Sequence, residues 1–321
     1  MNHILNITNG DSAVKIMQKA IIPGEFLAWQ DVLHDGPVPG DISLEALSKI
    51  RAEFIAQCGW GERSDIENLF TQRDDILKSS HQYEKIILWF EHDLYDQLQI
   101  LQILDWFNLN TNPNIALSLI CTDQYLGMLS PTQMKEMVKF EKIISAQQLT
   151  LASNAWSAFR HSSPEKWQDL LSQDTSSLPF LKSAIIRLLE QYPEAHNGLS
   201  RTAQSTLEII SSDENKPGKI FGLYQETEDA KFMGDATFWI ILQKLLDSTP
   251  PLLKIANGKT LTLPTNPSQS LSITPAGVAV MKAKQNWLDT NTIDRWIGGV
   301  HLTNNNIWCW NSRSQCMEKK Q

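Results

Sequence analysis

The sequence predicts an α/β protein built around a mainly parallel β-sheet. Strand-like and helical segments alternate through the first 130 residues, and the strand-like segment Ile86–Phe90 is continuously apolar. A strand that is apolar on both faces is buried on both sides, which is typical of parallel sheets covered by helices. A mixed α+β sheet is the alternative that this pattern leaves open.

The elements before residue 130 are expected in the following order. The segment His3–Thr8 is apolar and β-branched, and Asn9-Gly10 ends it before a helix that Asp11 or Ser12 can cap. Further strands are expected at 25–29, 85–90 and 114–121, with helices beginning near residues 11, 43 and 94. This order predicts a Rossmann-like domain over residues 1–130.

Two further regions follow this domain. Residues 131–196 are expected to form a helical extension and a linker, because Pro131, Pro164 and Pro179 each stand where a helix can begin. Residues 197–321 are expected to form a smaller winged-helix-like domain, since helical segments precede short strands and a further helix. Its elements are expected at 199–210, 235–246, 252–255, 260–263, 271–273 and 274–288, with a hairpin of 300–303 and 307–310 around Asn304–Asn306.

Composition excludes several classes of protein. The chain has 321 residues, of which 42% are hydrophobic and 20% charged, as in a folded protein and unlike a disordered chain or a collagen. No uncharged apolar run approaches the roughly 20 residues of a membrane helix, the first residues lack the pattern of a signal peptide, and the four cysteines form no CxxC pair. We therefore expect a cytoplasmic protein without a membrane partner.

Charge is distributed unevenly along the chain. Residues 1–196 carry 15 Lys and Arg against 25 Asp and Glu, a net charge of −10, whereas residues 197–321 carry 13 against 11, a net charge of +2. The acidic part does not attract a polyphosphate backbone unless a metal or a focused basic patch is present.

Polar residues gather where three of the expected strands end. Asp11 follows the first strand, Asp31, His34 and Asp35 follow the second, and Glu91, His92 and Asp93 follow the third. Parallel strands place their carboxyl ends at one edge of the sheet, so these side chains are expected to converge there. Acid/base chemistry or a divalent metal would then depend on Asp31, His34, His92 and Asp93, and ligand contacts on Gly10, Asp11, Ser12, Asp35, Gly36 and Glu91.

Each of these groups also has a structural interpretation. Asp11 and Ser12 are common helix caps, Gly36-Pro37 can anchor a turn around Asp31–Asp35, and His92-Asp93 can cap the following helix. The sequence contains no glycine-rich phosphate-loop motif, which excludes a nucleotide site of that type. It also contains no GxSxG elbow, which excludes the serine nucleophile that this motif presents. The cofactor stays undetermined, with a divalent metal as the candidate.

The C-terminal part offers a second class of function. Basic residues that could face DNA are Arg201, Lys231, Lys244, Lys254, Lys259 and Arg295. Glu226, Glu228 and Asp229 precede the helix expected at 235–246 and would repel phosphates. Nucleic acid is therefore a less favoured partner than a small molecule.

Three motifs in order resemble a bacterial family, domain of unknown function 1835. They are Asn9-Gly10-Asp11-Ser12, Trp29-Gln30-Asp31-Val32-Leu33-His34-Asp35-Gly36-Pro37 and Leu88-Trp89-Phe90-Glu91-His92-Asp93-Leu94-Tyr95-Asp96-Gln97-Leu98. The resemblance spans about residues 3–130, and Phe232–Asp235 with Arg295–Leu302 resembles the tail that often accompanies this domain. The family name implies domain boundaries but no activity.

The sequence thus favours a protein that binds, and can hydrolyse or transfer, a phosphorylated or nucleotide-like small molecule at the strand ends. The alternatives are a ligand-responsive DNA-binding regulator and a non-catalytic adaptor for another protein. Whether the chain is an enzyme is left open by its residues.

Overall fold

The computed structural model describes residues 3–256, 260–262 and 265–320 of the chain. The chain folds as two compact units, one comprising residues 1–185 with 298–300 and the other comprising 186–297 with 301–321. Within the described ranges, no helix combines the length and the hydrophobicity that a bilayer crossing requires.

The first unit contains a five-stranded sheet with the strand order β2-β1-β4-β5-β6. The first four strands are parallel to one another, and the short β6 runs antiparallel to β5. The strands are β1 Ile4–Thr8, β2 Glu25–Ala28, β4 Lys85–Glu91, β5 Ala116–Thr122 and β6 Lys142–Ile143, and a two-residue strand β3, Gly36–Pro37, lies in the loop after β2. The expectation of a mainly parallel sheet is confirmed.

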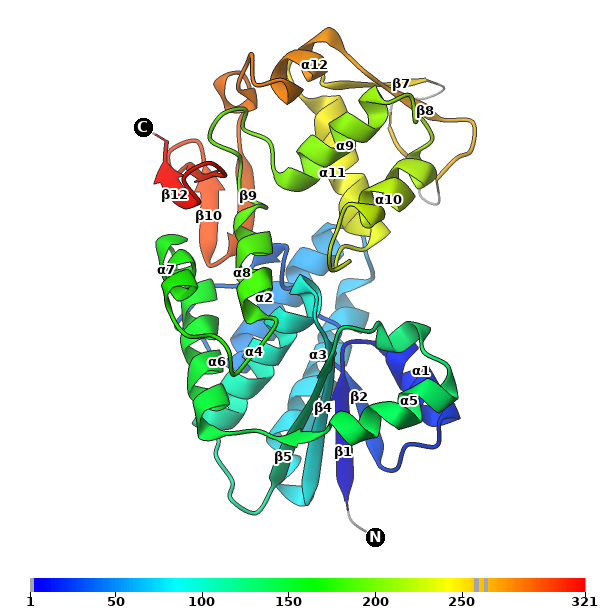
Figure 1. Ribbon diagram of the computed structural model, residues 1–321, viewed down its shortest axis with the longest axis vertical. Coiled ribbons are helices and arrows are strands. Elements are labelled where there is room, and N and C mark those ends of the chain that lie inside the picture. The colour runs from blue at the N-terminus through cyan, green and yellow to red at the C-terminus, as the bar shows by residue number, and fades with distance from the viewer. Residues whose placement is uncertain (1–2, 257–259, 263–264, 321) are drawn as a thin grey trace. The chain divides into compact units, whose positions relative to one another are not determined.

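Helices cover both faces of this sheet (Figure 1). On one face, Ala13 and Met17 of α1 and Met134 of α5 pack with Trp89 of β4 in a single apolar cluster. On the other face, α4 packs against β4 and α6 packs against α4. The helices of this unit are α1 Asp11–Lys19, α2 Leu44–Gln57, α3 Arg63–Lys78, α4 Leu94–Leu109, α5 Pro131–Met137, α6 Ala146–Phe159 and α7 Glu165–Asp169. The boundary between the two units falls within α8, Leu181–Leu189.

The region expected to be a helical extension is helical only in part. Pro131 occupies the first turn of α5, where Ser130 and Gln133 form a capping box. The edge strand β6 interrupts the helices, and Pro164 is the N-cap of α7. Residues 131–185 belong to the first unit.

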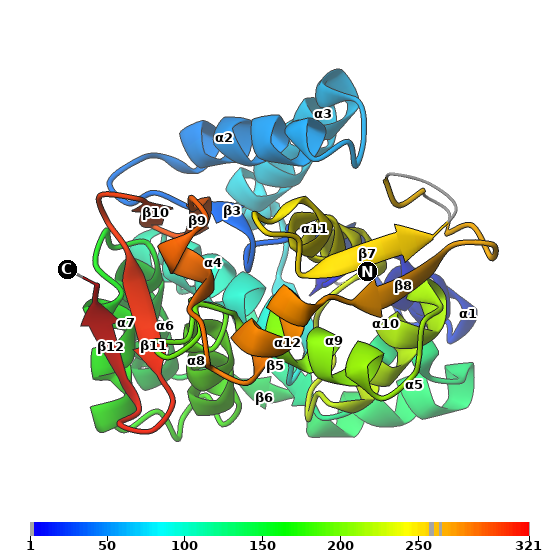
Figure 2. The same cartoon turned by 90° about the horizontal axis from the view of Figure 1, so that it is seen from above.

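The second unit begins with three helices and a two-stranded antiparallel sheet. Figure 2 shows β7 and β8 side by side next to these helices. The elements from residue 201 onward are α9 Arg201–Ser211, α10 Pro217–Glu226, α11 Asp235–Asp247, β7 Leu253–Ala256, β8 Ser270–Ile273, α12 Pro275–Met281, β9 Asp294–Gly298, β10 Val300–Thr303, β11 Trp308–Asn311 and β12 Cys316–Lys319. The last residue of β9 and the first of β10 belong to the first unit.

Three expectations for the C-terminal part are wrong. The helix that Thr274 caps ends at Met281 and does not reach Leu288, because Ala283 turns the backbone into the left-handed region (φ 52°). The turn at Asn304–Asn306 forms, with Asn306 N–H donating to the Thr303 carbonyl, but the strands beside it separate: β10 pairs with β9 and β11 with β12. Residues 260–262 form no strand, and residue 263 lies outside the described residues.

Candidate functional site

Hydrogen bonds join the four loops that follow the parallel strands. Gln30 N–H, after β2, donates to the carbonyl of Asn9, after β1 (3.2 Å). The Asn9 side-chain amide donates to Oε1 of Glu91 at the end of β4 (2.9 Å), and the backbone N–H of Leu126, after β5, donates to the same oxygen (2.8 Å). Segments more than 100 residues apart in sequence therefore meet at one edge of the sheet.

The strand order reverses at this edge between β1 and β4. After β1 the chain passes through α1 to β2, which lies on one side of β1 in the sheet. After β4 it passes through α4 to β5, and both of these strands lie on the other side of β1. The two connecting helices lie on opposite faces of the sheet (Figure 1). Open α/β sheets bind ligands where the strand order reverses in this way.

Three buried carboxylates lie at the end of β4 and in the first turn of α4. Glu91, Asp93 and Asp96 are 5%, 3% and 0% exposed, and one carboxylate oxygen of each lies within 4.8 Å of the others. Asp93 is the N-cap of α4, and its Oδ1 accepts a hydrogen bond from the Asp96 N–H (3.1 Å). The cap places Asp96 one helical turn after Asp93, which turns both carboxylates toward Glu91.

Asn9 holds two of these carboxylates in position. Its Nδ2 donates to Oδ1 of Asp96 (2.9 Å) as well as to Glu91, and the backbone N–H of Glu91 donates to Oδ2 of Asp96. Both hydrogen bonds that reach the Glu91 side chain end on Oε1. The Oε2 of Glu91 therefore accepts no hydrogen bond from the described residues.

These three carboxylates lack the cationic partner that other buried acids have. Among the residues that the structure describes, no lysine or arginine forms an ion pair with any of them. By contrast, Asp31, Asp74 and Glu228 are buried beside Arg51, Arg73 and Arg187, respectively. A buried charge needs a partner, a metal ion or a proton, because the protein interior solvates it poorly.

Burial raises the pKa of each carboxyl group in the cluster. Loss of solvation, followed by repulsion from Glu91, raises the pKa of Asp93 from its ordinary value of 3.8 to about 7. Burial and the charges of Asp93 and Glu91 raise the pKa of Asp96 well above its ordinary range, and burial raises that of Glu91. At neutral pH the cluster therefore favours binding of protons or of a cation.

Asp31, which we expected in an acid/base or metal-binding role, is part of a buried ion network. Its Oδ1 accepts a hydrogen bond from Nε of Arg51 (2.9 Å), and the Arg73 guanidinium lies 3.9 Å from its Oδ2. Arg51 also donates to the carbonyl groups of Val32, Asp35 and Pro37. The network fixes the loop after β2, so the structure gives Asp31 a role in holding this loop.

The two histidines of the expected site contact aromatic rings. His34 is buried with its ring centroid 6.0 Å from that of Tyr95, whose hydroxyl donates to the Asn9 carbonyl (3.4 Å). His92 is half-buried, 5.4 Å from the ring of Tyr125 and 5.7 Å from that of Phe180. Neither histidine belongs to the three-residue cluster, which contains only carboxylates.

The loop residues expected to contact a ligand divide into two groups. Asp11 and Ser12 are exposed in the first turn of α1, but the N-cap is Gly10 and no side chain caps the helix, so the capping interpretation is wrong. Gly36 adopts φ 81°, and its N–H donates a hydrogen bond to Oδ1 of Asp35. The Cα of Gly36 faces the ring of Phe54, which leaves no room for a side chain at this position. The first group lies at the beginning of α1, directly after the β1 loop, whereas the second forms a structural turn.

Asn9 and Asp96 are not among the site residues expected from the sequence. Asn9 directly follows β1, and Asp96 lies three residues after the cap of α4, where i and i+3 side chains share a face. The sequence positions of both residues could have identified them, because Asn9 follows a strand end and Asp96 lies in the first turn of the helix after the third expected strand.

The basic residues expected to face DNA differ in their surroundings: Lys231 and Lys244 are exposed, and Arg201 and Arg295 have partners. Arg201 pairs with Glu190 (2.7 Å), and Nη1 of Arg295 donates to the Gln191 carbonyl (2.9 Å). Lys254 is exposed on β7, and Lys259 lies outside the described residues.

A scan against protein-family models finds no match for the chain, and a search of curated proteins finds no relative.

Proposed function

We propose that the C-terminal edge of the parallel sheet binds a divalent cation through Glu91, Asp93 and Asp96, and that this cation holds a small phosphorylated molecule. The observation that carries the proposal is the grouping of three buried carboxylates with no lysine or arginine partner in the described part of the chain. A divalent cation satisfies such a group better than protons do once the pH exceeds the pKa of Asp93, about 7.

The donor set favours a hard cation. All three side chains offer carboxylate oxygens, which suit Mg²⁺, Mn²⁺ and Ca²⁺ and not the softer metals that prefer thiolates. Oε2 of Glu91 is available to such an ion, because the hydrogen bonds from Asn9 and Leu126 both reach Oε1. The cation would be the Lewis acid if the phosphorylated ligand is hydrolysed or transferred.

The beginning of α1 supports a phosphorylated ligand. Gly10 is the N-cap, its backbone is extended, and no side chain occupies the first N–H groups of this nine-residue helix. Helix N-termini bind anions through these N–H groups and the helix dipole. The cation offsets the negative charge of this acidic edge, which otherwise repels a phosphate.

The proposal predicts that Glu91→Gln weakens Mn²⁺ binding at pH 8 by about tenfold or more, because a charged ligand atom becomes neutral. Isothermal titration calorimetry of the full chain with Mn²⁺ measures this effect. Glu84→Gln is the matched control, because Glu84 is exposed and directly precedes the same strand at its other end. Equal Mn²⁺ affinity in the two variants contradicts the assignment of Glu91.

Pyrophosphate tests the second half of the proposal, because it carries phosphate groups and no base. We expect pyrophosphate to bind the Mn²⁺-loaded chain and not the metal-free chain. Equal binding of pyrophosphate with and without Mn²⁺ would show that the cation does not hold the anion.

A further inference from the structure

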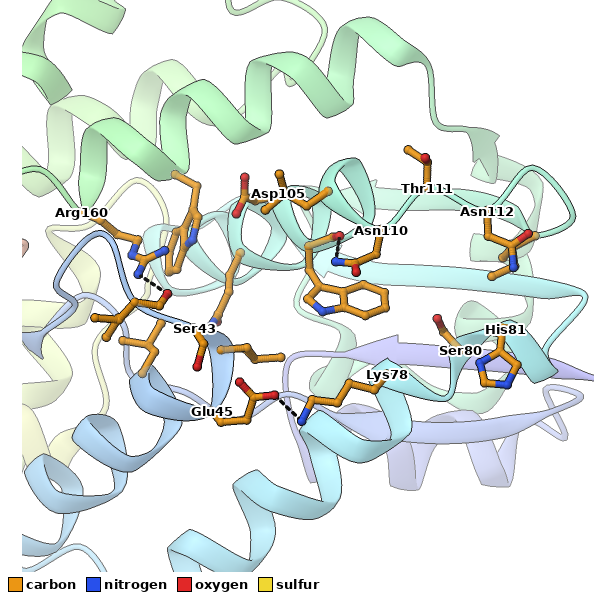
Figure 3. Close-up of a pocket in the computed structure, with 18 residues that line it drawn as sticks. Ser43, Glu45, Lys78, Ser80, His81, Asp105, Asn110, Thr111, Asn112 and Arg160 are labelled. Atoms are coloured by element: carbon orange, nitrogen blue, oxygen red, sulfur yellow. Dashed lines mark hydrogen bonds and ion pairs between the residues drawn. The ribbon is translucent and has the colours of Figure 1, made fainter.

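The first unit contains a groove of about 660 Å³ that shares no residue with the carboxylate site. It lies between the beginning of α2, the end of α3 and the second half of α4. Figure 3 shows Arg160 at one end of the groove, Ser80, His81 and Asn112 at the other, and the Glu45–Lys78 ion pair across from α4. The volume is typical of sites that bind small molecules.

One buried amide nitrogen in the wall of this groove, Nε2 of Gln102, has no hydrogen-bond partner in the described part of the chain. Gln102 is 3% exposed, and its Oε1 accepts a hydrogen bond from the Trp29 indole (2.8 Å). This bond fixes the orientation of the amide, because only the oxygen can accept from an indole N–H. The Nε2 of Gln102 is buried and has no partner among the described residues, although buried donors are almost always satisfied.

An acceptor stands beside this donor on the same face of α4. Asp105 follows Gln102 by three residues and also lines the groove, with Arg160 and the Ser153 hydroxyl near its carboxylate. Trp106 follows Gln102 by four residues and adds an aromatic surface to the same wall. Gln102, Asp105 and Trp106 therefore line the groove from one helix, and the unpartnered Nε2 of Gln102 is buried in its wall.

We propose that this groove binds a nitrogen heterocycle of the nucleobase type, with a ring nitrogen accepting from Nε2 of Gln102 and an adjacent exocyclic amine donating to Asp105. Trp106 offers the flat apolar face that such rings stack on. The proposal rests on α4 and its neighbours and does not depend on the carboxylate site.

Adenine and purine test the pairing on the unmodified chain. Adenine carries a ring nitrogen beside an exocyclic amine, whereas purine lacks the amine. We expect the full chain to bind adenine about tenfold or more tightly than purine, because an unfilled hydrogen bond to Asp105 disfavours purine. Calorimetry and tryptophan fluorescence measure both affinities. Equal affinities, or no adenine binding at millimolar concentration, overturn the proposal.

Gln102→Glu tests the donor directly. The substitution keeps an oxygen for the Trp29 indole and replaces the Nε2 donor with a second oxygen. We expect a loss of about tenfold or more in adenine affinity, whereas Gln72→Glu, at an exposed position of α3, leaves the affinity unchanged. Unchanged adenine affinity in a folded Gln102→Glu chain overturns the assignment. If that variant does not fold, the comparison of adenine with purine decides alone.

Discussion

Arg51→Met is expected to lower the free energy of unfolding by about 3–5 kcal/mol, because it leaves the charge of Asp31 buried without its closest partner. Both side chains are fully buried and their ion pair is 2.9 Å long. The same guanidinium donates to three carbonyl groups of the loop after β2, which lose these bonds as well. Urea denaturation of the variant and of the unmodified chain measures the difference.

Arg63→Met is the matched control for this loss. Arg63 also forms ion pairs, with Glu53 and Glu67, but its side chain is 58% exposed. Exposed pairs contribute about 0–1 kcal/mol, so the control is expected to change stability little. Adding Asp31→Asn to Arg51→Met should recover part of the loss, since the unpaired charge disappears. Equal effects of Arg51→Met and Arg63→Met would contradict the role given to this ion network.

Asp93→Asn is expected to stabilise the metal-free protein at pH 8, on the order of 2 kcal/mol. The cause is the pKa of Asp93, which burial and the neighbouring Glu91 raise to about 7. Asparagine caps helices about as well as aspartate, so α4 keeps its N-cap while the buried charge is removed. A functional residue whose removal stabilises the fold is typical of binding sites.

The sign of the pH dependence follows from the direction of this shift. Between about pH 4 and pH 7 the folded protein keeps a proton on Asp93 that the unfolded chain has lost, so stability falls as the pH rises through this window. The effect of Asp93→Asn should therefore be largest above pH 7 and absent near pH 4. Urea denaturation with a chelator at both pH values measures it.

Asp65→Asn, on the exposed surface of α3, is the control and should change stability by less than about 0.5 kcal/mol. Destabilisation by Asp93→Asn at pH 8 would show that the charge of Asp93 is favourable in the fold.

The strands of the sheet could be predicted because their apolar composition is a local signal. The segments expected at 3–8, 25–29, 85–90 and 114–121 correspond to β1, β2, β4 and β5 within two residues at each end. Their parallel pairing also placed the loop of Asn9 beside Glu91. The Rossmann-like and winged-helix-like assignments and the resemblance to domain of unknown function 1835 stay predictions.

The role of Asp31 could not be predicted, because its partners lie in other elements. Arg51 belongs to α2 and Arg73 to α3, and the packing of these helices decides that both guanidinium groups point inward. An arginine in a helix is usually exposed, so its sequence position gives no sign of burial. The arginine partners that depend on helix packing were thus missed, whereas Glu91 and Asp93 at the end of β4 were found.

Proton release on cation binding tests the carboxylate site most directly. Calorimetric titration with Mn²⁺ in buffers of different ionisation enthalpy counts the protons displaced at each pH. Because burial raises the pKa of all three carboxyl groups, that of Asp93 to about 7, we predict release of at least one proton per cation near pH 6 and release of fewer protons near pH 8.5. Absence of Mn²⁺ binding at both pH values, or binding with no release near pH 6, would contradict the assignment of this cluster.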